Sequence, residues 1–402
     1  MERKKMGKNY DFDARVDRRH TSCLKYDFGM KRKGREDLLP LWVADMDFAL
    51  PEEILEEFRR RIDHGIFGYT DPDEEYYRAL DHWFYSRHGY HVDPEWVTVG
   101  CGVVYGLATG VRAFTQEGDA ILIQQPVYYP FREVIEDNGR VFINSQLCYR
   151  EGRYTIDFED FERKIVENGV KAFILCNPHN PVGRVWTREE LMRLGDICLA
   201  HGVVILSDEI HCDFVYGNSR FTSFLTLGEK YRGNLAVYTS PSKTFNVAGF
   251  QPANILIPNE KLREAYRRAN AGAGYSQGNV MGQMAVKACY TKGGAWADEL
   301  VEYIWGNFGY VRDFVKENLP KARLVEPEGT YLAWIDFSGY GFTDQELEHV
   351  MTEEARLWLD SGKIFGPETA QFERFNLACP RATLEKAFGQ LKEAIEAHQK
   401  WS

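Results

Sequence analysis

The middle of the chain alternates short apolar runs with amphipathic segments, and this alternation constrains the fold more than any other feature. The apolar runs, rich in Val, Ile and Leu, cover residues 96–99, 120–124, 171–176, 203–207, 235–239 and 253–257. The amphipathic segments between them cover residues 103–114, 129–137 and 187–200. Strands that are apolar on both faces and separated by helices form mostly parallel sheets covered by helices on both sides. The sequence therefore predicts an α/β fold.

The pattern changes after residue 260. Helical periodicity covers residues 261–270, 277–290, 296–318, 344–360 and 384–399, and strand-like runs cover 331–337 and 375–378. This mixture is typical of a smaller α+β domain. We therefore expect a large domain over residues 50–288 and a small domain built from residues 1–49 and 289–402.

The composition narrows the class of partner. The 49 Lys and Arg residues against 60 Asp and Glu residues give a net charge of −11, which argues against nucleic acid or an anionic membrane as a partner. No apolar run is long enough to cross a bilayer, and none follows the basic residues near the start as in a signal peptide. The eight cysteines show no C-x-x-C spacing, so we expect reduced thiols in a cytoplasmic protein.

Ligands of open parallel sheets bind beyond the carboxyl ends of the strands, so the residues that follow each predicted strand are candidate site residues. The first such segment, residues 100–106, has the sequence GCGVVYG and leads into a helix. Free N–H groups at a helix N-terminus bind phosphate. A plain strand-to-helix turn explains these glycines equally well.

Three further strands end at polar residues. Asn180 lies in NPHNPVG at residues 177–183, Asp208 and His211 lie in SDEIH at 207–211, and Lys243 ends SPSK at 240–243. Taken one at a time, these residues are equally compatible with a tight loop, a helix cap, a packing histidine and a surface lysine. The chain has no H-E-x-x-H or similar ligand spacing, so we expect no metal site.

Together, these strand-end groups match the requirements of one cofactor, pyridoxal phosphate. A lysine such as Lys243 forms a Schiff base, and a carboxylate such as Asp208 keeps the pyridine nitrogen protonated so that the ring accepts electrons. Asn180 supplies a hydrogen-bonding amide, Tyr128 an aromatic ring, and the glycine-flanked helix start a phosphate site. Their order and placement favour this chemistry over the separate alternatives.

The motifs at residues 177–183, 207–211 and 240–243 occur in the order and approximate spacing of the fold-type I, aspartate-aminotransferase-like superfamily of pyridoxal-phosphate enzymes, which the chain resembles. Four further stretches resemble the MalY/PatB branch of cystathionine β-lyases, or C–S lyases. They are WVADMDF at 42–48, FGY at 67–69, TFN at 244–246 and CPR at 379–381. The resemblance implies a seven-stranded, helix-covered sheet in the large domain and a homodimer with shared active sites.

The resemblance also implies residue roles. Lys243 is expected to form the Schiff base and to move the α-proton, and Arg374 to bind the substrate α-carboxylate as a fork. Asp208 is expected to contact the ring nitrogen of the cofactor, Asn180 its phenolic oxygen, and Tyr128 the face of its ring. The phosphate is expected to be bound by Gly102, Val103, Val104, Ser240 and Ser242, together with Tyr69 of the partner subunit. His211 is expected to support these contacts from nearby.

The activity implied is α,β-elimination of cystathionine or a related cysteine S-conjugate to a thiol (homocysteine), pyruvate and ammonia. The alternative is a class I/II aminotransferase on the same scaffold, and a third hypothesis is a non-catalytic binding protein. Many aminotransferases carry tyrosine where this chain has His211, and arginine where it has Gln251. Both differences favour the lyase.

Overall fold

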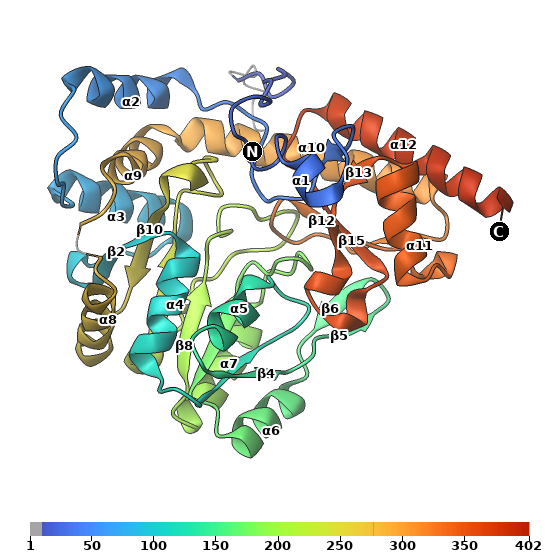
Figure 1. Ribbon diagram of the computed structural model, residues 1–402. Coiled ribbons are helices and arrows are strands. Elements are labelled where there is room, and N and C mark those ends of the chain that lie inside the picture. The colour runs from blue at the N-terminus through green and yellow to red at the C-terminus, as the bar shows by residue number, and fades with distance from the viewer. Residues whose placement is uncertain (1–9, 276, 402) are drawn as a thin grey trace.

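The computed structural model describes residues 10–275 and 277–401. Its centre is a sheet of seven strands, with helices on both sides (Figure 1). The strand order is β2-β10-β9-β8-β7-β3-β4. The strands are β2 (Val97–Cys101), β3 (Ala120–Ile123), β4 (Val141–Asn144), β7 (Ala172–Cys176), β8 (Val204–Asp208), β9 (Leu235–Thr239) and β10 (Pro252–Leu256). Of these seven strands, only β10 runs in the opposite direction to the others. The predicted mostly parallel sheet is confirmed.

Alternate residues of the central strands enter two separate apolar cores, one on each face of the sheet. On β3, Ile121 and Ile123 belong to one core and Leu122 to the other. The first core packs against α4 (Val103–Phe114), α5 (Pro130–Glu136) and α8 (Glu260–Gly272), and the second against α6 (Phe158–Asn168) and α7 (Arg188–Ala200). Burial on both faces explains why these strands are apolar without alternation.

Helix α4 lies unusually close to the sheet because two of its residues are glycines. A Cβ atom at Gly110 would lie 2.2 Å from the Tyr238 hydroxyl, and one at Gly106 would lie 3.2 Å from the same ring. The helix begins after Gly102, whose φ of +85° favours glycine. The glycines thus fix where the N-terminus of α4 meets the sheet edge.

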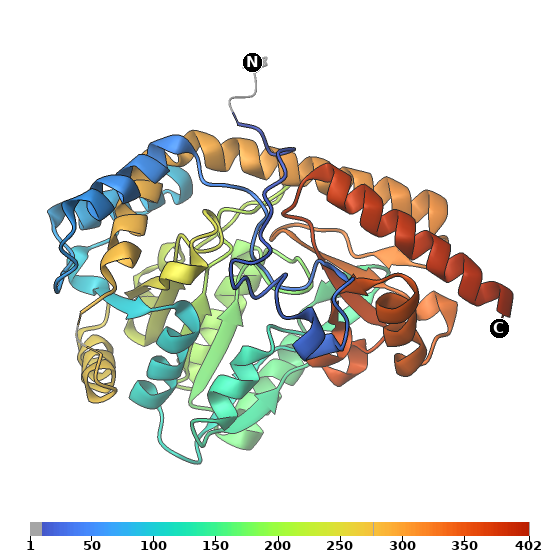
Figure 2. The same cartoon turned by 45° about the horizontal axis from the view of Figure 1, so that its top comes forward.

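The C-terminal part forms a second layer. A four-stranded antiparallel sheet has the order β11-β12-β15-β14, and Figure 2 shows the long helices α10 and α12 side by side above it. The elements are α9 (Val280–Lys292), α10 (Gly294–Asn318), β11 (Arg323–Leu324), β12 (Leu332–Asp336), α11 (Asp344–His349), β14 (Asp360–Ser361), β15 (Phe372–Asn376) and α12 (Arg381–Trp401). The expected α+β block is present, whereas the domain boundaries stay a prediction.

The predicted helix over residues 344–360 is wrong in its second half. Helix α11 ends at His349 and is followed directly by a π-helical stretch, Val350–Glu354. Arg356 then adopts a left-handed conformation with φ +55°, and β13 (Leu357–Trp358) pairs in parallel with β1 (Leu39–Pro40). The apolar residues of this segment are buried in a strand. The prediction failed because the period of a short apolar run fits a helix and a strand equally well.

The sequence analysis missed α6, strand β4, two helices near the N-terminus and a hairpin. Helices α2 (Glu52–His64) and α3 (Glu74–His88) pack against α9, and β5 (Cys148–Arg150) pairs with β6 (Arg153–Thr155). A short helix, α1 (Gly29–Lys33), precedes β1. Within the described ranges, no helix is both long and apolar enough to span a membrane, and all eight cysteines are free thiols.

Residues 41–48 form a segment without regular secondary structure that runs beside β15. The Asn376 N–H donates to the Leu41 carbonyl at 2.8 Å, and the Asp47 N–H donates to the Ala378 carbonyl at 3.0 Å. Buried Lys25 holds the segment through its Nζ, which lies 2.9 Å from Asp47 Oδ2. The segment is therefore fixed beside β15.

Candidate active site

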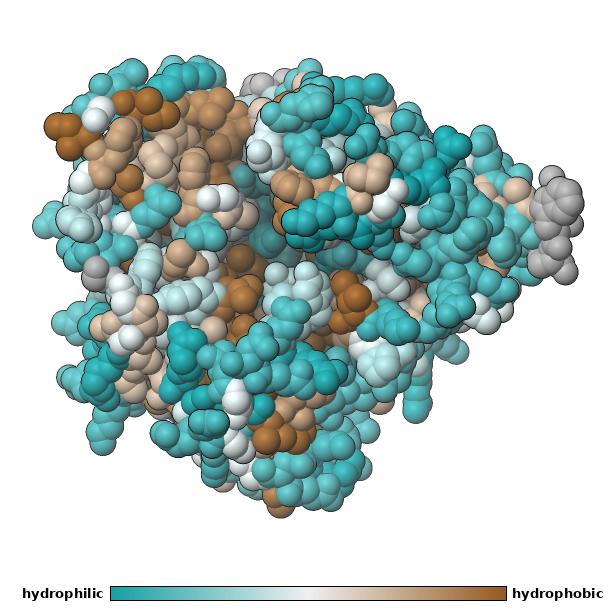
Figure 3. All heavy atoms as spheres, viewed as in Figure 1, coloured by the Kyte–Doolittle hydropathy of each residue, from teal (hydrophilic) through white to brown (hydrophobic). Residues whose placement is uncertain are grey.

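Asp208 is the last residue of β8, and Asn180 and Lys243 follow the carboxyl ends of the neighbouring strands β7 and β9. Since these strands are parallel and pair in register, their ends meet at one edge. The face drawn in Figure 3 is hollowed near its centre. The strand-end clustering expected from the sequence is thus present in the fold.

Lys243 presents an amine to the N-terminal segment. Its Nζ donates to the Ala44 carbonyl at 2.7 Å. Burial and then the charge of Arg374 lower the pKa of Lys243 to about 8, against opposing effects of Asp45 and Asp208. An amine with this pKa is partly unprotonated near neutral pH, as a nucleophile or a base must be.

Asp208 is a buried carboxyl group that fits a cationic partner. It is 5% exposed, and burial raises its pKa to about 7, although the Ile210 N–H donates to its Oδ1 at 3.1 Å. Within the described residues, no Lys, Arg or His side chain forms an ion pair with it. A protonated ring nitrogen would offset the cost of ionising this group.

Arg374 is oriented by three elements. Its Nη1 donates to Asn180 Oδ1 at 2.9 Å, and its Nη2 donates to the Trp42 carbonyl at 2.8 Å and to the carboxylate of Asp360. The guanidinium lies 4.9 Å from the centre of the Phe365 ring. Its buried Nε has no hydrogen-bond partner within the described part of the chain. A guanidinium fixed in this way can bind a carboxylate.

The start of α4 and the loop after β9 form a polar cradle. Ser240 Oγ lies 2.8 Å from Ser242 Oγ and 2.6 Å from the Pro252 carbonyl, and it accepts from the Ser242 N–H at 3.0 Å. Pro252 pairs with Cys101, one residue before Gly102. The loop that carries the two serines therefore lies near the start of α4, where the first N–H groups have no partner within the helix and could bind a phosphate.

Two aromatic rings and a histidine complete the surroundings of Lys243. His211 is 3% exposed, burial moves its pKa well below the usual value, and its ring lies edge-on to Tyr331 at 5.6 Å. The Tyr331 hydroxyl donates to the Ala44 carbonyl at 2.8 Å, the carbonyl that Lys243 contacts. Tyr128 is half-buried, and its N–H donates to the Asn180 carbonyl at 3.0 Å. Expected and unexpected side chains thus share one site.

Tyr69 lies apart from these groups. It is 95% exposed, in the segment between α2 and α3, and its expected partner is a second subunit. Ile62, Ile66 and Phe67 nearby in the sequence are each more than half exposed, and Figure 3 shows apolar surface over α2 at the upper left. A surface of this kind is typical of a protein interface.

The sequence analysis missed several site groups. Tyr331 and Asp360 were assigned only to secondary structure, and the carbonyl groups of Trp42 and Ala44 carry no residue-type signal. The only sequence feature that could have indicated these groups was the acidic and aromatic stretch at 42–48, which was used only to identify the family.

The comparisons with known proteins agree with this geometry. Residues 36–391 match the protein family Aminotransferase class I and II. The chain belongs to this family. The resemblance expected from the sequence is confirmed.

Among proteins similar to this chain is cystathionine beta-lyase PatB of Bacillus subtilis (strain 168), which is 42% identical over 385 residues, covering 96% of this chain and 100% of that protein. The solved structure of cystalysin from Treponema denticola, which contains a pyridoxal 5′-phosphate cofactor, has a TM-score of 0.94 at 35% identity and covers 96% and 99% of the two chains. The PLP-bound C–S lyase from Staphylococcus hominis has a TM-score of 0.91 at 34% identity and covers 96% and 98%.

Proposed function

We propose that this protein is a pyridoxal-phosphate-dependent C–S β-lyase that cleaves cystathionine or a related cysteine S-conjugate. One observation carries the proposal: the Lys243 amine, the buried Asp208 carboxyl and Asn180 lie at one edge of the mostly parallel sheet, where the Arg374 guanidinium, from β15, contacts Asn180. The similarity to cystathionine beta-lyase PatB and to two pyridoxal-phosphate-containing structures supports the choice of reaction and cofactor.

Pyridoxal phosphate, when bound, withdraws electrons from the α-carbon of an amino acid joined to it. Asp208 would face the ring nitrogen and Asn180 the phenolic oxygen, while Ser240, Ser242 and the start of α4 would hold the phosphate. Asn180 Oδ1 already accepts from Arg374, and no bond from its Nδ2 to another described residue competes for that donor. The Asn180 amide would thus bind the cofactor through its nitrogen and orient Arg374, which binds the substrate carboxylate, through its oxygen.

Lys243 and Arg374 act on the substrate. Arg374 holds the α-carboxylate, which fixes the α-carbon near the Lys243 amine. The Lys243 amine would take the α-proton of a substrate held in this way, and its pKa of about 8 suits this transfer.

The products follow from the bonds that break. Loss of the α-proton leaves an electron pair that forms the Cα–Cβ double bond while the Cβ–S bond breaks. The sulfur leaves with that bond's electrons and takes up a proton as a thiol. The three-carbon fragment then adds water and yields pyruvate and ammonia, so cystathionine gives homocysteine.

The assay is thiol and pyruvate release from cystathionine by the purified protein, with no keto acid added. Lys243→Ala is the matched inactive control, because it removes the amine but none of the Arg374 contacts. Release of both products by the wild-type protein alone is expected. Turnover that requires an added keto acid would favour the aminotransferase instead.

The homodimer belongs to the same proposal. Tyr69 would reach the phosphate in the partner subunit, and the exposed Ile62, Ile66 and Phe67 would be covered there. Mixing inactive Lys243→Ala with impaired Tyr69→Ala chains tests this arrangement, because hybrid dimers contain one intact site. Activity that rises after subunit exchange supports shared sites, and no rise contradicts them. The cytoplasmic location stays a prediction.

A further inference from the structure

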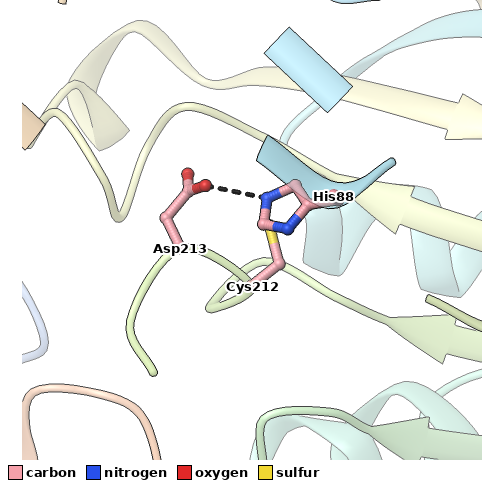
Figure 4. A group of neighbouring side chains, drawn as sticks. All are labelled: His88, Cys212 and Asp213. Carbon is pink, nitrogen blue, oxygen red and sulfur yellow. Dashed lines mark hydrogen bonds and ion pairs between the residues drawn. The ribbon is translucent and has the colours of Figure 1, made fainter. Parts of the chain in front are cut away.

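A histidine, a cysteine and an aspartate cluster behind the loop that carries Lys243. The ligand atoms of His88, Cys212 and Asp213 all lie within 4.8 Å of one another. Figure 4 shows the imidazole facing the carboxylate, with the cysteine sulfur beside the ring. The His88 and Asp213 side chains are 8% and 5% exposed. The function proposed above uses none of these residues.

Asp213 receives hydrogen bonds from three donors. His88 Nε2 lies 2.9 Å from Asp213 Oδ1, and because a carboxylate only accepts, this nitrogen carries the proton. The other oxygen, Oδ2, accepts from Thr244 Oγ1 at 2.6 Å and from Trp83 Nε1 at 3.3 Å. His88 and Trp83 both lie on α3, so the carboxylate connects this helix to the loop after β9.

The charges in the cluster favour a structural role, in which Asp213 holds the loop after β9, over a metal site. Burial alone would raise the pKa of the Asp213 carboxyl, but the His88 hydrogen bond and the charges of His88 and Arg87 outweigh it and lower the pKa. Burial raises the pKa of the Cys212 thiol well above its usual value. A metal would need a thiolate and a free carboxylate oxygen, whereas both oxygens of Asp213 already accept.

The anchored residue, Thr244, directly follows Lys243. It is 1% exposed. The next residue, Phe245, packs edge-on against Trp83, with ring centres 5.4 Å apart, and stacks on Trp296 at 5.7 Å. The chain on the carboxyl side of the reacting lysine is therefore fixed both by a charged hydrogen bond and by aromatic contacts.

We propose that Asp213, oriented by His88, is a positioning residue that fixes the Lys243 amine through the hydroxyl of Thr244. The inference rests on the proposed function only in taking Lys243 as the reacting amine. An error of about 1 Å in the placement of a catalytic group can cost about 10²-fold in rate. The anchor acts on the lysine and leaves the Arg374 contacts unchanged.

The decisive pair of variants is Thr244→Val, which removes the hydroxyl at nearly constant shape, and Thr244→Ser, which keeps it. We expect Thr244→Val to lower kcat about 10- to 100-fold with KM within about twofold of wild type, because substrate binding is intact. Thr244→Ser should restore kcat to within about threefold of wild type. If Thr244 only stabilised the fold, Thr244→Val would lower the midpoint of thermal unfolding but would not lower kcat while leaving KM unchanged.

A second readout needs no turnover. In the cofactor-free full-length protein, reductive methylation of Lys243 is followed by peptide mass spectrometry from pH 6 to pH 10. Thr244→Val and Asp213→Asn should move the midpoint of this labelling away from the wild-type value, and Thr244→Ser should not.

Wild-type kcat and labelling in Thr244→Val would overturn the proposal, as would equal damage from Thr244→Ser. If Thr244→Val does not fold, the labelling midpoint of Asp213→Asn decides in the same way. Absence of lyase turnover in the wild type would reject the proposed function, whereas the labelling comparison would still decide the positioning role.

Discussion

Replacing Asp208 with asparagine tests the electrostatics of the site in the cofactor-free protein. Burial raises the pKa of Asp208 from 3.8 to about 7, so its carboxylate is costly in the folded state. Asparagine has nearly the same shape and keeps an oxygen for the Ile210 N–H. It carries no charge at any pH.

The size of the effect follows from the pKa difference. Because the pKa is higher in the folded protein, the folded state holds an extra proton between pH 4 and 7, and stability is lost as the pH rises through this window. Each pH unit within it costs about 1.4 kcal/mol. Between pH 5 and pH 8 the wild-type protein should lose about 2.5 kcal/mol that Asp208→Asn does not lose.

Urea unfolding of both cofactor-free proteins at pH 5 and pH 8, at equal protein concentration, measures this difference. Burial also raises the pKa of the neighbouring Glu209 to about 7. Because Glu209 titrates in both proteins, its contribution largely cancels in the difference between their free energies of unfolding. Asp313→Asn, on the exposed side of α10, is the matched control. A stability gap between Asp208→Asn and wild type that does not widen toward pH 8 would refute this account of Asp208.

Three further substitutions test the rest of the account. Lys243→Ala should abolish the visible absorbance band of the lysine-bound cofactor and lower pyruvate release by at least about 10³-fold, within the range for losing a general base; a normal spectrum would exclude Lys243 as the attachment site. Arg374→Lys should raise KM about 10- to 100-fold in steady-state kinetics, because a point charge replaces a fork worth about 1.5–3 kcal/mol per hydrogen bond; an unchanged KM would place the carboxylate elsewhere. Lys25→Met should lower the free energy of unfolding by about 3 kcal/mol, since it removes a buried cation 2.9 Å from Asp47. The exposed control Lys230→Met should leave the free energy of unfolding nearly unchanged, and an equal loss in both variants would contradict the role of Lys25.

The parts of the fold that could be predicted depend on local pattern. The six strands expected from unalternated apolar runs all occur, because both of their faces are buried, and α4 has the expected bounds, 103–114. Asn180, Asp208 and Lys243 could be placed because the carboxyl ends of parallel strands meet at one edge.

The remaining features depend on contacts between distant parts of the chain. Residues 357–358 form a strand because β1 lies beside them, and no local period distinguishes that strand from a helix. Asp360 and the carbonyl groups of Trp42 and Ala44 join the site only when the N-terminal segment and β14 reach Arg374 and Lys243. The Asp213 anchor likewise needs α3, which the sequence analysis did not identify.

The most direct test of the central claim is the fate of the substrate nitrogen when both reactions are possible. Cystathionine is supplied with excess keto acid, and ammonia, thiol, pyruvate and newly formed amino acid are quantified together. The account predicts equal amounts of thiol, pyruvate and ammonia, with little amino acid derived from the keto acid. Transfer of the nitrogen to the keto acid without thiol release would contradict it.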